Sequence, residues 1–143
     1  MSRLLDNATS TRTAWIAVLV YTVVITYLLL APHPLWLLGA SGQDIERTID
    51  RTIAGFVQHV LAYALLACLL AWASRKAYGT PQFSWAVLAI GHGIGTELLQ
   101  YFIPPRYCDW PDGLANTLGV AFGWLAAVWI LRAAGKPGGE TIA

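Results

Sequence analysis

The chain has 143 residues, of which 57% are hydrophobic and only 12% charged, and its formal net charge is +1. An ordinary soluble domain carries about twice that share of charge, so the composition favours one small membrane-embedded domain spanning residues 1–143. Without clustered Lys and Arg, the chain also lacks the basic surface that binding to nucleic acid requires.

Four apolar runs follow one another along the chain, each close to the ~20 residues that a helix needs to cross a bilayer. Because lipid offers no partner for backbone polar groups, each run is expected to be helical. We therefore predict an all-α polytopic membrane protein whose four transmembrane helices form an antiparallel bundle. The predicted spans cover residues 14–31, 56–73, 83–103 and 113–131.

The sequence also predicts the structure of two segments outside the spans. Between the first two spans, Ile45, Ile49, Ile53 and Phe56 recur every three or four residues, which predicts a short amphipathic helix on the membrane surface. Residues 135–143 are rich in Pro and Gly and are expected to form a flexible tail.

The distribution of basic residues predicts how the chain is oriented. The side that is richer in Lys and Arg is normally cytoplasmic, so both termini are predicted to lie in the cytoplasm. Six basic residues fall on that side and three on the other: Arg3, Arg12, Arg75, Lys76, Arg132 and Lys136 against Arg47, Arg51 and Arg106.

Polar residues converge on the predicted outer ends of spans two, three and four. Ionisable groups within a span cost at least ~2.5–3.5 kcal/mol each, so their convergence at one depth indicates a site that opens outward. The candidate ligand-binding residues are His59 and Tyr63 in span two, Glu97 and Gln100 in span three, Arg106 and Asp109 in the loop, and Asp112 and Asn116 in span four.

Part of this pattern resembles a known family. The stretch GTELLQYFIPPR at 95–106 and the stretch DGLANTLG at 112–119 are similar to the core of VanZ-like membrane proteins, and His59 with Tyr63 resembles the upstream His-x-x-x-Tyr element. Many members carry an acidic-basic pair just before that histidine, where this chain has Gly55 and Phe56. Whether Asp50 and Arg51 join the site instead is left open.

The resemblance implies a role in the cell envelope, since the family takes its name from a member associated with resistance to the glycopeptide teicoplanin. It also implies the inner membrane of a bacterium as the location, and it implies no established reaction. The partners expected are the lipid bilayer and an anionic lipid, a lipid-linked cell-wall precursor or a glycopeptide-related ligand.

Several interpretations of the polar residues remain open. In the first, Arg106 forms ion pairs with the carboxylates and fixes the outer ends of spans three and four, which is a purely structural role. In the second, Arg106 binds a phosphate or carboxylate of a ligand. A membrane-embedded hydrolase or transferase acting on a phosphate-bearing lipid would use His59 or Glu97 as its base. A small transporter or proton pathway is the least favoured, because the inner halves of the spans are largely apolar.

No cofactor is predicted. A metal site formed by His59, Glu97 and Asp112 is conceivable, but a nearby Arg106 would repel the ion. Gly91 with Gly95 and Gly119 with Gly123 form small-residue pairs four apart, which predicts close packing of helices within the chain or between copies. The oligomeric state is left open.

Overall fold

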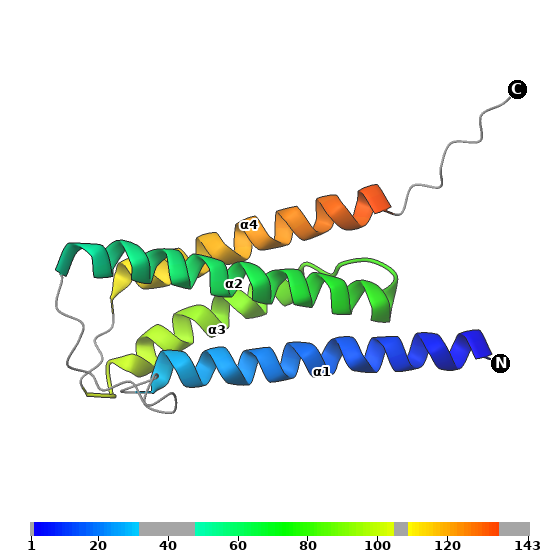
Figure 1. The fold of residues 1–143 in the computed structure, drawn as a ribbon, viewed down its shortest axis with the longest axis horizontal. Coiled ribbons are helices and arrows are strands. Elements are labelled where there is room, and N and C mark those ends of the chain that lie inside the picture. Colours follow the sequence, from blue (N-terminus) through cyan, green and yellow to red (C-terminus); the bar gives the residue numbers. More distant parts are fainter. Residues whose placement is uncertain (1, 32–47, 105–108, 135–143) are drawn as a thin grey trace, which may run out of the picture.

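A computed structural model describes residues 2–31, 48–104 and 109–134 of the chain. Over these ranges the protein is all-α, as predicted, without a strand. The helices are α1 (Ser2–Leu30), α2 (Thr48–Tyr78), α3 (Ser84–Gln100) and α4 (Trp110–Ala134). They run alternately in opposite directions along one long axis, so that α1 begins and α4 ends at the same end of the bundle (Figure 1).

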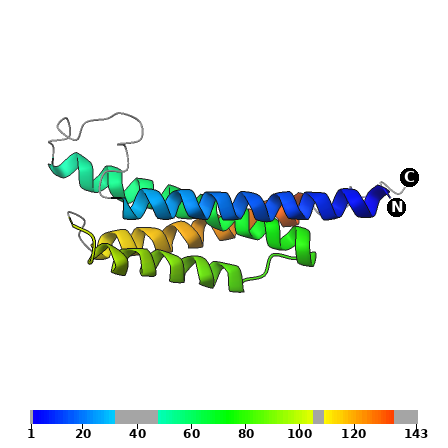
Figure 2. The same cartoon turned by 90° about the horizontal axis from the view of Figure 1, so that it is seen from below.

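The helix α2 is the centre of this bundle. It packs most extensively against α4 and also contacts α1 and α3, whereas α1 and α4 do not touch each other within the described ranges. Figure 2 shows α3 and α4 lying side by side. The bundle has two ends, which we name after residues that lie there. At the Leu30 end, α1 and α3 finish and α2 and α4 begin. The opposite side of the bundle is the Tyr78 end.

Three stretches are long and apolar enough to cross a membrane: Thr9–Leu30, Ile53–Tyr78 and Trp110–Ala134. All three are longer than the predicted spans, since each helix continues into its polar flanks. The helix α3 has only 17 residues and ends at Gln100 rather than at residue 103. It is thus ~25 Å long, slightly less than the ~30 Å of hydrocarbon in a bilayer. The count of four spans therefore stays a prediction.

The early end of α3 has a local cause. Residues 101–104 form turns that lead into Pro104, and a proline disfavours the helical conformation of the residue before it. The predicted surface helix lies partly outside the described residues, which resume at Thr48 within α2. Because α2 then runs unbroken to Tyr78, Ile53 and Phe56 belong to its early turns. The predicted flexible tail at 135–143 lies outside the described residues.

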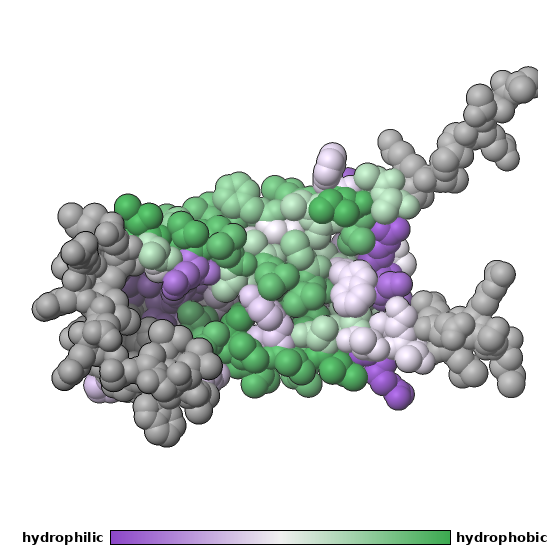
Figure 3. All heavy atoms as spheres, viewed as in Figure 1, coloured by the Kyte–Doolittle hydropathy of each residue, from purple (hydrophilic) through white to green (hydrophobic). Residues whose placement is uncertain are grey.

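The middle of the bundle is apolar on its surface. Figure 3 shows a hydrophobic belt between two ends where hydrophilic residues gather. Each helix contributes large apolar side chains that are more than half exposed, such as Leu19, Leu61, Leu88 and Leu125. A continuous apolar surface of this kind is unfavourable in water and fits the hydrocarbon of a bilayer.

Glycines set the distance between α2 and α4. A Cβ atom at Gly119 would lie 3.0 Å from Tyr63 Cβ, and one at Gly123 would lie 2.6 Å from Ala64 Cα. On α3 the close contact is made by Gly93, whose Cβ would stand 2.9 Å from Asn116 Cβ. The predicted α3 pair does not make this contact, because Gly91 and Gly95 lie on the opposite face, where an added Cβ would meet nothing within 4 Å.

Side chains also tie the helices together at the Tyr78 end. The Arg75 guanidinium donates a hydrogen bond to the carbonyl of Leu131 in α4. The Thr11 hydroxyl of α1 donates to the carbonyl of Lys76 at 3.3 Å. Carbonyls in the last turn of a helix have no partner within that helix, so these bonds satisfy them while joining α1, α2 and α4.

Candidate functional site

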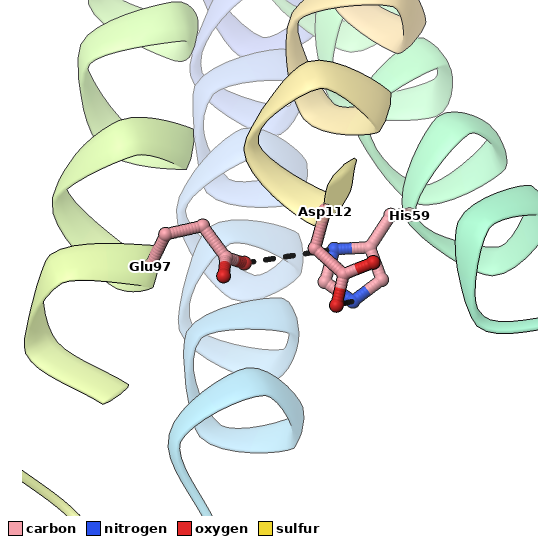
Figure 4. Close-up of side chains that lie close together, drawn as sticks. All are labelled: His59, Glu97 and Asp112. Atoms are coloured by element: carbon pink, nitrogen blue, oxygen red, sulfur yellow. Dashed lines mark ion pairs between the residues drawn. The ribbon is translucent and has the colours of Figure 1, made fainter. Parts of the chain in front are cut away.

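Three ionisable side chains from three different helices meet at the Leu30 end of the bundle. His59 lies about three turns into α2, Glu97 lies one turn before the end of α3, and Asp112 lies in the first turn of α4. Because α2 and α4 begin where α3 ends, these positions fall at a similar depth. Figure 4 shows the Glu97 carboxylate pointing from α3 towards the other two side chains.

The His59 imidazole stands between the two carboxylates. Its Nε2 lies 3.7 Å from Asp112 Oδ2, and its Nδ1 lies 3.9 Å from Glu97 Oε1. Both distances are longer than a hydrogen bond and within reach of an ion pair. The side chain of Glu97 is 5% exposed and that of Asp112 is 30% exposed, so the group is deepest at Glu97 and opens at Asp112.

Asn116 orients the imidazole. Its Oδ1 lies 2.9 Å from His59 Nδ1, and its Nδ2 donates to the carbonyl of Gly93 at 3.3 Å. An amide oxygen only accepts hydrogen bonds, so His59 Nδ1 carries the proton, and in the neutral ring Nε2 keeps its lone pair. Asn116 is almost wholly buried and packed against Gly93, which holds this arrangement in place. We call His59, Glu97, Asp112 and Asn116 the polar cluster.

The carboxylate of Glu97 is the least satisfied group in the cluster. The backbone N–H of Asp109 and the amide of Asn116 are donors on its side of the cluster. Neither carboxylate oxygen, however, makes a hydrogen bond of normal geometry within the described part of the chain. A buried acceptor without a partner loses its hydration without compensation, so Glu97 requires an explanation.

The other candidate residues have different surroundings. Gln100 Nε2 donates to the carbonyl of Leu29 at 2.9 Å and so binds the end of α1 rather than the cluster. The Tyr63 hydroxyl lies 2.9 Å from His92 Nδ1 and 3.2 Å from Thr96 Oγ1. Asp109 is exposed beside the cluster, and Arg106 lies outside the described residues.

A family model described as VanZ/LLP1 matches residues 18–132, which is most of the chain and includes the whole polar cluster. The chain belongs to the VanZ/LLP1 family. No curated protein and no solved structure matches it.

Family membership confirms the resemblance that was drawn from the motifs at 95–106 and 112–119. Together with the long apolar helices, it identifies the chain as a VanZ-like membrane protein.

The cluster of this VanZ/LLP1 protein has the chemistry to hold a positive group and to move a proton. Two carboxylates and one imidazole each offer one atom that could bind a cation, and these three atoms lie within 4.8 Å of one another. Carboxylates attract cations and hydrogen-bond donors, and an imidazole whose proton is held at Nδ1 has a lone pair available at Nε2.

A second polar layer lies beneath the cluster and joins Tyr63, a sequence-based candidate, to His92 and Thr96, which were not candidates. His92 Nε2 is 2.9 Å from Thr26 Oγ1 of α1, and its Nδ1 bonds Tyr63. Thr96, which also bonds Tyr63, is 3% exposed. The sequence signal for this layer is that a histidine and threonines stand within apolar runs, where an unpartnered polar group is costly.

Proposed function

We propose that this VanZ/LLP1 protein binds a phosphate-bearing lipid head group at the polar cluster. The observation that carries the proposal is the Glu97 carboxylate, which is buried, is aimed into the cluster, and lacks a hydrogen-bond partner in the described structure. A head group with hydroxyl or ammonium donors satisfies that carboxylate. Arg106, two residues after Pro104 in the sequence, is the expected partner of the phosphate.

The surroundings of the cluster favour a lipid-like ligand over a fully water-soluble one. The outer faces of α2, α3 and α4 are apolar next to the cluster, as at Val57 and Leu98. A shallow groove of ≈ 490 Å³ follows the last turns of α1, lined by Thr22, Val23, Thr26, Tyr27, Leu30 and Ala31. That groove contains no cluster residue, and its apolar lining suits an acyl or polyprenyl chain. A lipid-linked cell-wall precursor combines such a tail with a polar head.

The proposal places the cluster on the outer side of a bacterial inner membrane, with four spans and both termini in the cytoplasm. In support, Arg12, Arg75, Lys76 and Arg132 all lie towards the Tyr78 end, opposite the cluster. Exposed apolar side chains on α3, including Leu88 and Ile94, support that helix as the fourth span despite its length.

Labelling of the termini tests this orientation. A fluorescent protein fused after Ala143 is expected to be fluorescent, and alkaline phosphatase fused at the same place is expected to be inactive, because both then lie in the cytoplasm. Active alkaline phosphatase at the C-terminus would place the cluster on the inner side and remove the access to outer-leaflet ligands.

Ligand binding is tested with the full chain in lipid nanodiscs. The probes are a sugar-bearing undecaprenyl phosphate, phosphatidylethanolamine and teicoplanin, which separate a polyprenyl-linked precursor, an acyl phospholipid and a glycopeptide-related ligand, and the first two carry the hydroxyl or ammonium donors that Glu97 requires. Glu97→Gln and Arg106→Ala are each expected to weaken binding of the preferred phosphate lipid at least about tenfold, equivalent to about 1.4 kcal/mol. Arg132→Ala, at the Tyr78 end, is the control and is expected to bind normally.

The same measurement separates the remaining interpretations. If the charged side chains only form ion pairs that fix the helix ends, the Glu97→Gln and Arg106→Ala variants lose thermal stability and the wild-type protein binds none of the three probes. That result contradicts the proposal. Selective binding of teicoplanin would replace the phosphate lipid with the glycopeptide as ligand and would favour a direct role in resistance.

A membrane-embedded hydrolase or transferase is the second candidate. It is favoured by the position of His59, whose Nδ1 is bonded to Asn116 and whose Nε2 faces Asp112, since a general base needs a fixed ring and an available lone pair. Release of phosphate from undecaprenyl phosphate by wild-type protein, lost in a His59→Gln variant that still binds the lipid, would establish this function over simple binding.

A further inference from the structure

We infer that His59, Glu97 and Asp112 bind one divalent transition-metal ion, with Zn²⁺ or Mn²⁺ as the best match. The inference deepens the proposed function and rests on it for the ligand, because an ion held by the two carboxylates gives the cluster a positive centre for a phosphate. The ion site itself stands on the geometry of the three side chains.

The distances suit an ion of this size. Zn²⁺ binds imidazole nitrogen at ~2.0–2.1 Å and carboxylate oxygen at ~2.0–2.2 Å, so two of its ligand atoms lie at most ~4.4 Å apart. His59 Nε2 and Asp112 Oδ2 are 3.7 Å apart, and one atom from each of the three residues falls within 4.8 Å of the others. Glu97 Oε1 lies 3.9 Å from His59 Nδ1, so the Glu97 side chain has to turn towards the Nε2 side of the ring to complete the site.

The tautomer of His59 is the one that a metal ligand needs. A metal-bound histidine normally donates the N–H of its other nitrogen to a carbonyl or carboxylate, which fixes the ring and increases its basicity. Here Nδ1 donates to Asn116 Oδ1, whose amide is held in turn by the Gly93 carbonyl. The lone pair of Nε2 therefore points to the side of Asp112.

The unpartnered carboxylate of Glu97 provides the independent observation. Glu97 is 4% exposed, and neither of its oxygens has a hydrogen-bond partner in the described ranges. Over the same ranges, His59 is the only basic side chain within ion-pair distance of it. An ion with two positive charges compensates the buried carboxylate of Glu97 and takes the place that the proposed function gives to a donor of the head group, so that the phosphate binds the ion.

The donor set selects the kind of ion. One imidazole nitrogen with two carboxylates is suited to Zn²⁺ or Mn²⁺, whereas Mg²⁺ and Ca²⁺ prefer ligands that are all oxygen. Three protein ligands also leave at least one coordination position for a water or a phosphate oxygen, as in metal sites that bind substrates. Asp112, the most exposed of the three side chains, marks the open side.

The test measures metal bound to the full chain purified in detergent. The protein is stripped with EDTA, incubated with ZnCl₂ or MnCl₂, desalted and measured by elemental mass spectrometry, with Mn²⁺ electron paramagnetic resonance as a second readout. We expect one ion per chain. Glu97→Gln, Asp112→Asn and His59→Gln are each expected to lower the affinity at least tenfold, whereas Thr117→Ala, on α4 but outside the polar cluster, leaves it unchanged.

Retained helical circular dichroism and a monodisperse elution profile establish that each variant is folded. Absence of bound metal from the wild-type protein overturns the inference, as does binding that persists undiminished in folded Glu97→Gln and Asp112→Asn variants. Metal binding that is absent from the wild type and present in Arg106→Ala also overturns it, because Arg106 then occupies the place assigned to the ion.

Lipid binding in EDTA separates the metal from the proposed function. If the sugar-bearing undecaprenyl phosphate binds equally well without metal, the ligand proposal stands and the metal has no part in it. If metal binds at the three residues and no phosphate lipid binds, the metal site stands and the proposed ligand is wrong.

Discussion

Replacing Gly123 by alanine is expected to destabilise the folded bundle by about 1–3 kcal/mol, even though alanine is the better helix former. The added Cβ would overlap the carbonyl oxygen of Ala64 and stand 2.6 Å from its Cα. Both atoms belong to the backbone of α2, so no side chain can turn away, and the two helices must separate. Separation would also weaken the bond from the Cys68 thiol to the Gly123 carbonyl, at present 3.2 Å long.

Unfolding of the purified protein in mixed micelles with increasing dodecyl sulfate, followed by circular dichroism, measures this effect. Gly91→Ala is the matched control, because its Cβ would meet nothing within 4 Å. The control is expected to gain up to about 1 kcal/mol from helix propensity alone. Equal stability of the two alanine variants would show that α2 and α4 do not approach each other as closely as described.

Replacing Asn116 by alanine is expected to weaken both the fold and the binding site. The change leaves the His59 Nδ1–H without its partner and removes one of the donors to the Gly93 carbonyl, which still accepts from the Thr96 hydroxyl at 2.9 Å. Each unsatisfied group costs about 1–3 kcal/mol in the general case, and interhelical hydrogen bonds in membranes average about 0.6 kcal/mol, so a loss of about 1–3 kcal/mol in total is expected. Metal affinity is expected to fall about 10–100-fold, because the imidazole is no longer held in the required tautomer.

The neighbouring residue gives the control for this second prediction. Among the residues that the structure describes, the Thr117 hydroxyl donates to the Gly113 carbonyl one turn back in α4 and to no other group. Thr117→Ala is therefore expected to change stability by less than about 0.5 kcal/mol and to leave metal binding intact. If Asn116→Ala binds metal as tightly as Thr117→Ala does, the histidine needs no orienting partner and that part of the argument is wrong.

The polar residues illustrate how far sequence reasoning reaches. The spacing of Glu97 and Gln100 places them on one face of a helix. In the structure Glu97 turns towards His59, whereas Gln100 reaches Leu29 on α1. Tyr63 likewise follows His59 by one turn, yet its hydroxyl bonds His92 and Thr96 in a deeper layer. Spacing identifies a face, and the neighbour on that face depends on how the helices are packed.

The amino-acid sequence alone determined the all-α class, the membrane character, the family and the common depth of His59, Glu97, Asp112 and Asn116. These properties depend on apolar runs, motifs and positions near helix ends, which are local along the chain. Only the tertiary structure decided which of these side chains face one another, and that Gly93 rather than Gly91 or Gly95 packs closely. The physical reason is that the rotation of each helix about its axis is set by contacts between distant residues, such as Gly123 against Ala64.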